Sequence, residues 1–260
     1  MIRVGVLGAK GKMGSTVCQA VMQDPDLLLV AAVDTHIDSS NTVGSSSELE
    51  IEISPDIESV KEQGSQVVVD FTRADSARDN IKWLAQNSIH AVVGTTGFSS
   101  QDIVDFENLF SNTSANCLIA PNFAIGAILM IRFAELAARF MDMEIIELHH
   151  DRKIDAPSGT ALLMAQRAVQ ARNATQNMVS KSPENLRARG DNSSGINIHS
   201  VRLKGLIAHH EAIFSSQGQS LTIRHDSFDR TSFMPGVVLA IKKVFDFPGL
   251  SVGLDSYLDL

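Results

Sequence analysis

The stretch from 147 to 161 carries more ionisable and polar side chains than any other part of the chain. It contains the imidazoles of His149 and His150, the ammonium of Lys153 and, at 157–160, a Pro-Ser-Gly-Thr turn. Positions 149 and 153 share one side of the backbone in a strand and also in a helix, so we expect His149 and Lys153 to meet. A proton donor and a cation directed at one point suit a substrate that is anionic and must be protonated.

The Pro-Ser-Gly-Thr turn is followed at 161–169 by the apolar spacing of an amphipathic helix. Ser158 is a favoured cap residue, and the backbone N–H groups of Gly159 and Thr160 would lie at the start of that helix. A helix N-terminus of this kind binds a carboxylate or a phosphate without a charged side chain. The stretch therefore predicts a site for an anionic substrate. The two adjacent histidines would point to opposite faces of a strand and so do not predict a metal site.

A second motif opens the chain. Residues 2–7 have the composition of a short buried strand, three glycines follow at positions 8, 11 and 14, and 15–22 has the pattern of a helix. Strand, glycine turn and helix in this order are typical of a dinucleotide-binding unit, in which the helix N-terminus receives the pyrophosphate. The usual Gly-x-Gly-x-x-Gly spacing would need a glycine at position 10, where this chain has Lys10.

The choice of dinucleotide depends on the next strand, predicted at 28–33. It ends in Asp34, twenty residues beyond Gly14, where an acid binds the adenosine ribose of NAD. Such an acid repels the extra phosphate of NADP, but Lys10 and Lys12 stand close by and could offset that repulsion. The sequence leans towards NADH and leaves NADPH open.

Strands and helices then alternate. Further strands are predicted at 66–72, 90–97 and 116–123, with helices at 75–87 and 100–110, while 36–50 is Ser-rich and predicts a poorly ordered surface loop. This alternation predicts a doubly wound parallel sheet, which binds ligands beyond the carboxyl ends of its strands. Those ends carry small or polar residues at Gly8, Asp34, Phe71–Thr72, Gly94–Thr96 and Ala120–Phe123.

After Phe123 the pattern changes. A long helix is predicted at 127–141, a flexible polar excursion at 174–195, and extended runs at 196–203, 208–215 and 219–226, the last two joined by a Gln217–Gly218 hairpin turn. Hairpin-joined strands predict an antiparallel or mixed sheet, and the helix at 234–245 and strand at 251–254 then return to the first sheet. We therefore predict a dinucleotide-binding domain at 1–123 and 233–260, and a second, α+β domain at 124–232.

The composition bounds the class of protein. Of the 260 residues 44% are hydrophobic, so a sizeable core can form, and the net charge of −8 argues against nucleic-acid binding. The two cysteines, Cys18 and Cys117, predict no disulfide framework. The longest apolar run, 118–131, is interrupted by Pro121 and Asn122 and is too short for a membrane span. We expect a soluble cytoplasmic protein with no membrane or nucleic-acid partner.

The run His149-His150-x-x-Lys153-x-Asp155-Ala156-Pro157-Ser158-Gly159-Thr160-Ala161 resembles the signature of the 4-hydroxy-tetrahydrodipicolinate (dihydrodipicolinate) reductase family of diaminopimelate and lysine biosynthesis. The resemblance extends over nearly all of the chain. It implies a split Rossmann-type domain with an inserted mixed-sheet domain, assembly into a homotetramer, and NADH or NADPH as cofactor. The implied reaction is reduction of the cyclic imine formed from 4-hydroxy-tetrahydrodipicolinate, with loss of water.

The resemblance also implies roles for individual residues. His149 would donate the proton with help from Lys153, while His150 and the amides of Gly159 and Thr160 would bind the carboxylates of the substrate. The implied cofactor-binding residues are Gly8, Ala9, Lys10, Gly11, Lys12, Met13, Asp34, Gly94, Thr95, Thr96, Ala120, Pro121, Asn122 and Phe123.

Two other functions share part of this pattern. Another Rossmann-type reductase of a small dicarboxylate, such as an amino-acid dehydrogenase, would share the logic of the first 123 residues but has no reason to carry the 149–161 signature. In a regulator that senses NAD(P) without turnover we would expect residues of that signature to be lost, but the signature is intact here. The polar cluster at 224–230 suits a domain joint, a substrate contact or a solvated strand edge, and is left outside the predicted catalytic set.

Overall fold

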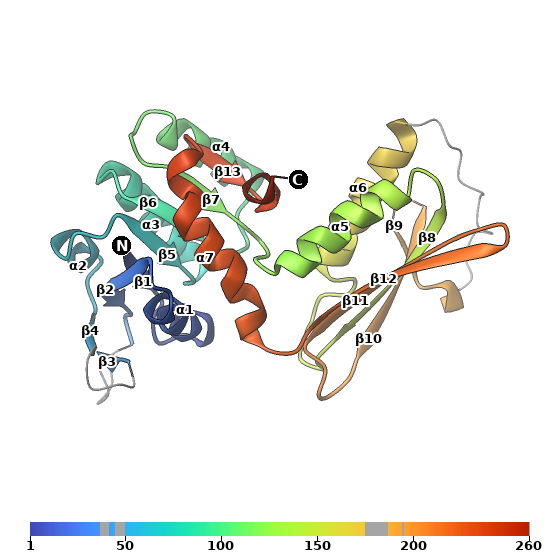
Figure 1. The fold of residues 1–260 in the computed structure, drawn as a ribbon, viewed down its shortest axis with the longest axis horizontal. Coiled ribbons are helices and arrows are strands. Elements are labelled where there is room, and N and C mark those ends of the chain that lie inside the picture. The colour runs from blue at the N-terminus through green and yellow to red at the C-terminus, as the bar shows by residue number, and fades with distance from the viewer. Residues whose placement is uncertain (37–41, 45–49, 175–186, 194, 260) are drawn as a thin grey trace. The chain divides into compact units, whose positions relative to one another are not determined.

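The computed structural model describes residues 1–36, 42–44, 50–174, 187–193 and 195–259. The chain forms two compact units, one made of Met1–Phe123 with Phe233–Leu260 and the other of Ala124–Ser232 (Figure 1). None of the helices in these ranges has both the length and the apolar character needed to span a bilayer.

The first unit is built on an eight-stranded sheet in the order β13-β7-β6-β5-β1-β2-β4-β3, parallel except for β3. Its strands are β1 (Ile2–Leu7), β2 (Leu27–Val33), β3 (Thr42–Val43), β4 (Ile51–Ser54), β5 (Val67–Asp70), β6 (His90–Val93), β7 (Cys117–Ile119) and β13 (Leu250–Val252). The central strands are nearly continuous runs of buried aliphatic residues, as expected where helices cover both faces of a parallel sheet. The predicted doubly wound parallel sheet is confirmed.

Helices cover both faces of this sheet (Figure 1). They are α1 (Lys12–Gln23), α2 (Glu58–Glu62), α3 (Ala74–Gln86), α4 (Ser100–Phe110) and α7 (Met234–Lys243). Ile81, Leu84, Phe106 and Phe110 of α3 and α4 form one core with alternate strand residues such as Val68. On the other face α1 and α7 contact each other, so the last helix belongs to the first unit. The strand order reverses between β1 and β5, and ligands bind at such a switch point.

The second unit contains a five-stranded mixed sheet in the order β12-β11-β8-β10-β9. Its strands are β8 (Asp142–His149), β9 (Asp191–Ser193), β10 (Ile196–Arg202), β11 (Ala208–Ser216) and β12 (Gln219–Ser227). Among the described strands of this sheet, only β8 and β10 pair in parallel. The predicted Gln217–Gly218 hairpin is confirmed, since Ser216 pairs with Gln219 and Gly218 has a φ of 79°.

Two helices, α5 (Ile125–Ala137) and α6 (Gly159–Ala174), cover one face of this mixed sheet (Figure 1). Met130 and Met164 of these helices pack against Ile145, Ile198 and Phe214 of the strands. Side chains alternate along β8, so every second residue enters this core and the others lie on the opposite face of the sheet.

Two loop predictions need correction in the described residues. Part of the polar segment 174–195 is ordered, because Asp191–Ser193 pairs antiparallel with β10 as the edge strand β9, and Arg187–Arg189 form a 3-10 turn. Within 36–50, Thr42–Val43 pair with β4. Both strands are too short, at 2 and 3 residues, to show the apolar alternation that marks a strand in sequence. The remainder of the two predicted loops, at 37–41, 45–49, 175–186 and 194, lies outside the described residues.

Candidate active site

The core face of β8 changes from apolar to ionisable along the strand. Met143 and Ile145 belong to the hydrophobic core, and Glu147 and His149 follow on the same face because strand residues two apart share a side. Glu147 has no exposed surface and His149 is only 7% exposed. A buried carboxylate and imidazole at the end of a core strand need partners, because isolated charge is costly to bury.

Glu147 finds those partners on three different elements. Its Oε2 lies 2.5 Å from Nδ1 of His149, and Arg202 of β10 donates to both oxygens, from Nη1 to Oε2 at 2.8 Å and from Nη2 to Oε1 at 2.7 Å. The backbone N–H of Ser158 donates to Oε1 at 3.2 Å. Burial alone would raise the pKa of Glu147, but hydrogen bonds from His149, Arg202 and Ser200 hold that pKa well below its usual range. Glu147 is therefore a buried, ionised carboxylate.

His210 of β11 lies beside this group. It is paired in register with Glu147, and its ring centre is 5.2 Å from that of His149 in an edge-on arrangement. Its Nε2 lies 3.0 Å from Oγ of Ser158, which in turn accepts from the N–H of Ala161 and so caps α6. Burial, together with the charge of His149, lowers the pKa of His210 to about 3. His210 is thus neutral near pH 7.

Lys153 lies in the turn after β8. The prediction that 149 and 153 share one side of a continuous strand or helix is wrong. β8 ends at His149, and the N–H of Lys153 donates to the carbonyl of His150 at 3.1 Å, so 149 and 153 are not joined by a continuous strand or helix. Burial is the main cause of the lowered pKa of His210, and the charge of the Lys153 ammonium adds a smaller contribution. Its Nζ is 2.8 Å from Oδ2 of Asp155, and this contact lowers the pKa of Asp155.

The start of α6 is open. Gly159 and Thr160 are the first residues of this helix, and a Cβ placed on Gly159 would meet no atom within 4 Å. Nδ1 of the half-buried His150 has no hydrogen-bond partner among the described residues. Helix N–H groups, the ammonium of Lys153 and the imidazole of His149 therefore occur in one unit, as a dicarboxylate site would require.

In the first unit, the glycine turn after β1 has the geometry of a phosphate site. Gly8 has a φ of 77°, and a Cβ on Gly14 would lie 1.9 Å from the carbonyl oxygen of Gly8. Gly11 is the N-cap of α1 and has no side chain to bond the helix N–H groups. The turn and the helix start can therefore approach a pyrophosphate closely.

Asp34 supports this turn directly. Its Oδ2 accepts from the N–H of Lys10 at 2.9 Å and its Oδ1 from the N–H of His36 at 3.0 Å. A carboxylate has about four acceptor sites, so these two bonds leave capacity for ribose hydroxyls.

Asp70, at the end of β5, is a residue that the sequence interpretation missed. It is fully buried, and its Oδ1 accepts from the N–H of Thr72 at 2.8 Å, the hydroxyl of Thr72 at 2.7 Å and the hydroxyl of Thr95 at 3.0 Å. Asn80 donates to its Oδ2 at 2.8 Å. One carboxylate thus joins the ends of β5 and β6. The signal in the sequence was a single charged residue after three valines.

The turns after β5, β6 and β7 pack closely. A Cβ on Gly94 would lie 2.1 Å from the ring of Phe71, which is itself 5.8 Å from the ring of Phe123. The hydroxyl of Thr95 is bonded inward to Asp70. Of the other predicted cofactor residues, Ala9 and Ala120 are buried, Lys10, Met13 and Asn122 are half-buried, and Gly11, Lys12, Thr96 and Pro121 are exposed.

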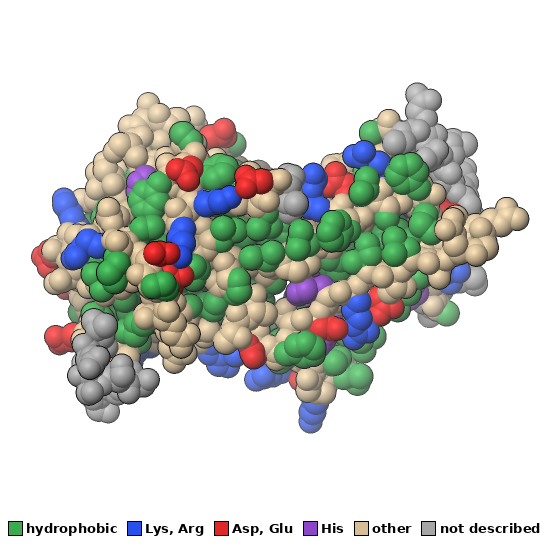
Figure 2. Space-filling view, in the orientation of Figure 1, with side chains coloured by type: hydrophobic (Ala, Val, Ile, Leu, Met, Phe, Trp, Pro, Cys, Tyr) green, Lys and Arg blue, Asp and Glu red, His purple; other side chains and the backbone are tan. Residues whose placement is uncertain are grey.

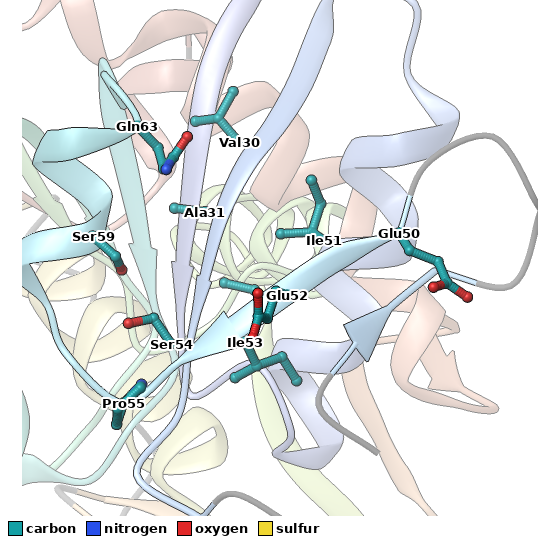
Figure 3. Close-up of a pocket in the computed structure, with 11 residues that line it drawn as sticks. Val30, Ala31, Glu50, Ile51, Glu52, Ile53, Ser54, Pro55, Ser59 and Gln63 are labelled. Atoms are coloured by element: carbon teal, nitrogen blue, oxygen red, sulfur yellow. The ribbon is translucent and has the colours of Figure 1, made fainter. Parts of the chain in front are cut away.

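A separate hollow of about 470 Å³ runs along β4 (Figure 3). Glu50 and Glu52 are among the residues that line it, and none of the described lining residues is a cation. Such a lining does not suit a phosphate or a dicarboxylate. Elsewhere in the described part of the chain, no three His, Cys, Asp or Glu side chains converge as a metal site would require.

Both halves of the chain match one family. The models described as "Dihydrodipicolinate reductase, N-terminus" and "Dihydrodipicolinate reductase, C-terminus" match residues 2–123 and 126–258. The 4-hydroxy-tetrahydrodipicolinate reductase of Nocardia farcinica (strain IFM 10152) is 48% identical over 266 residues, with 100% of this chain and 99% of the relative covered. That of Cutibacterium acnes (strain DSM 16379 / KPA171202) is 45% identical over 271 residues, with 100% of both covered.

The fold is also similar to a solved structure. The dipicolinate-bound dihydrodipicolinate reductase from Paenisporosarcina sp. TG-14 aligns with a TM-score of 0.85 at 40% sequence identity. The alignment covers 98% of this chain and 99% of that one. The likeness therefore includes the sheets of both units.

Proposed function

This chain belongs to the dihydrodipicolinate reductase family, and from that premise we propose that it reduces 4-hydroxy-tetrahydrodipicolinate to tetrahydrodipicolinate with loss of water. The electrons come from NADH or NADPH, and the reaction serves diaminopimelate and lysine biosynthesis in the cytoplasm. The single observation that carries the proposal is the buried Glu147–His149 pair at the end of β8, in the same unit as Lys153 and the open start of α6.

The first unit is the dinucleotide-binding domain in this proposal. The turn from Gly8 to Met13 fits a pyrophosphate, because Gly11 presents no side chain and Gly14 lets α1 approach the turn. Asp34 holds the adenosine ribose. Gly94, Thr95, Thr96 and the segment 120–123 hold the nicotinamide half. When bound, the reduced nicotinamide supplies the hydride.

The second unit binds the substrate and supplies the proton. Lys153, His150 and the N–H groups of Gly159 and Thr160 hold the two carboxylates. His149 bonds Glu147 through Nδ1, which leaves Nε2 as the nitrogen that delivers the proton to the ring. Because the cluster is buried, little water can reach His149 and compete with the substrate for its proton.

The second unit also carries the contacts for a homotetramer. Helix α5 exposes Phe133 and Leu136, which are 51% and 56% exposed, and Phe140 just after the helix is 75% exposed. Figure 2 shows apolar side chains gathered over this helix. Exposed apolar patches of this kind mark protein–protein contacts. The edge strand β12 also leaves backbone groups that a second copy could cover.

The proposal is tested by following NADH oxidation with enzymatically generated substrate. His149→Gln should lower kcat by about 10²–10⁴-fold, the usual worth of a general acid, with little change in the KM for substrate. Lys153→Met should raise that KM and also lower kcat, because the ammonium binds the substrate carboxylates in the ground state as well as in the transition state. Neither variant should lose affinity for NADH.

His199 provides a matched control. It pairs with Glu144 at 2.9 Å on the other face of the same sheet, so His199→Gln removes a similar contact away from the site. Its kcat should stay close to that of the parent. A His149→Gln enzyme with near-normal kcat would end the assignment, and an equal loss of NADH affinity would point to misfolding. Binding of NADH without any turnover by the parent chain would favour the nucleotide-sensing alternative.

A further inference from the structure

Glu147, the partner of His149, forms a buried ion pair with Arg202 of β10. We propose that Glu147 is a positioning residue for proton transfer by His149, and that Arg202 fixes Glu147 in its ionised form and in one orientation. This inference rests on the proposed function, in which His149 is the proton donor. Glu147 and Arg202 would not contact the substrate themselves.

The first argument is the number of bonds that hold the carboxylate. Oε1 accepts from Arg202 and from the N–H of Ser158, and Oε2 accepts from Arg202 and faces Nδ1 of His149. These donors come from β10, from the turn before α6 and from β8 itself. The carboxylate cannot rotate without breaking several charge-assisted bonds inside the protein. Glu147 is therefore a fixed point against which the imidazole is aligned.

The second argument concerns which nitrogen of His149 carries a proton. An ionised carboxylate only accepts hydrogen bonds, so Nδ1 must be the donor in the 2.5 Å contact. A ring held in this way presents Nε2 to the substrate. In the transfer the Nε2–H bond breaks, its electron pair stays on nitrogen, and the proton bonds to the reduced ring. The product is a neutral Nδ1–H imidazole, and Glu147 remains ionised throughout.

The third argument is the charge balance. Glu147 on its own strand, Arg202 on β10 and His210 on β11 lie around His149. Lys153 on the following turn and His225 of β12 act electrostatically on His210. Burial holds His210 neutral, and Arg202 cancels the charge of Glu147. The net charge offered to an anionic substrate therefore comes from Lys153 and protonated His149.

Arg202 also reaches the turn that carries Lys153. Its Nη2 donates to the backbone carbonyl of Asp155 at 2.7 Å, and Asp155 pairs with Lys153. One guanidinium thus fixes both the carboxylate behind the proton donor and the loop that holds the ammonium. A lysine at position 202 could not make this planar set of bonds.

The test is Glu147→Gln, which keeps the shape of the side chain and removes its charge. The amide can still bond Arg202, but its NH₂ group would face Nδ1 of His149 and favour the tautomer with the proton on Nε2. We expect kcat to fall by about 10²-fold or more, as for loss of a general acid, with NADH affinity unchanged.

A spectroscopic measurement separates alignment from simple structural damage. The ring ¹⁵N resonances of His149, identified by their loss in His149→Gln, should report a proton on Nδ1 in the parent and a shift towards Nε2 in Glu147→Gln. Glu144→Gln is the matched control, because Glu144 also contacts an arginine and a histidine, Arg189 and His199, but on the opposite sheet face. That variant should keep the parent kcat, pH profile and His149 resonances.

Arg202→Lys is the second variant, in case Glu147→Gln does not fold. It keeps a positive charge but loses the planar set of bonds that orients Glu147, so it should reduce kcat and shift the His149 resonances towards Nε2. Unchanged His149 resonances in whichever variant folds would overturn the inference while leaving the proposed function intact. If the parent chain gave no turnover, the proposed function would fail, whereas the resonances would still decide whether Glu147 directs the proton on His149.

Discussion

Replacement of Gly14 by alanine tests the dinucleotide site through a contact that nothing in the turn can relieve. A Cβ on Gly14 would lie 1.9 Å from the carbonyl oxygen of Gly8, 2.6 Å from the carbonyl carbon and 3.1 Å from Cα of Ala9. Ordinary contacts begin at 3.4 Å, so the gap must open by 3.4 − 1.9 = 1.5 Å. All three opposing atoms belong to the backbone, and no side chain can rotate away. The start of α1 must therefore move relative to the turn.

The magnitude follows from that displacement. Overpacking of this kind costs about 1–3 kcal/mol of folding stability. Phosphate bonds to the helix N–H groups work over roughly 2.7–3.2 Å, so a shift of the calculated size breaks them. Loss of one such charge-assisted bond, worth about 1.5–3 kcal/mol, corresponds to at least a tenfold rise in the Kd for NADH.

Calorimetric titration with NADH measures this change, and urea unfolding shows how much stability is lost. Gly159→Ala is the matched control, because it places the same methyl group in the first turn of another helix with no atom within 4 Å. It should leave NADH affinity unchanged. A folded Gly14→Ala protein that binds NADH as tightly as the parent would refute the argument that close approach of α1 to the turn forms the site.

Three other predictions concern the cofactor, the assembly and pH. Asp34 favours a free ribose hydroxyl, while Lys10 and Lys12 can tolerate a phosphate. Calorimetry should therefore give Kd values for NADH and NADPH within about tenfold of each other, roughly 1.4 kcal/mol. A hundredfold preference for NADPH would contradict the role given to Asp34. Light scattering should report about four times the chain mass of 28.1 kDa, and a clean monomer would remove the tetramer proposal alone. The pKa of His210 is lowered from 6.5 to about 3, so only the unfolded chain takes up this proton as pH falls below 6.5. The free energy of unfolding should therefore decrease on acidification, by up to about 1.4 kcal/mol per pH unit, and less steeply in His210→Gln. Urea unfolding at about pH 7 and about pH 5 measures this slope, and identical slopes in both proteins would contradict the assignment.

Much of the architecture could be predicted because it depends on residues close together in the chain. The glycine turn, the alternation of buried strands with helices and the Gln217–Gly218 hairpin follow from local backbone preferences and side-chain periodicity. Helix α4 begins and ends at Ser100 and Phe110, as its sequence pattern indicated. The short strands β3 and β9 were missed because pairing with β4 and β10, and not their own sequence pattern, makes them strands.

The candidate site divides in the same way. The sequence of the 147–161 stretch was enough to single out His149, Lys153, Gly159 and Thr160. The argument that His149 and Lys153 share one face failed, because β8 ends at His149. The groups behind His149 depend on contacts between distant positions. Arg202 is 55 residues from Glu147, and His210 is 52 residues from Ser158.

The pairing of β10 and β11 with β8 brings these side chains together on one face of the sheet, at the end of β8 that carries His149. A shift of either strand by one residue would turn Arg202 or His210 to the other side of the sheet. Burial then decides their chemistry, because it keeps His210 neutral and makes an ionised Glu147 depend on its hydrogen-bond donors. The sequence by itself determined which residues could react, whereas sheet register and burial decided which of them are held together and in which charge state.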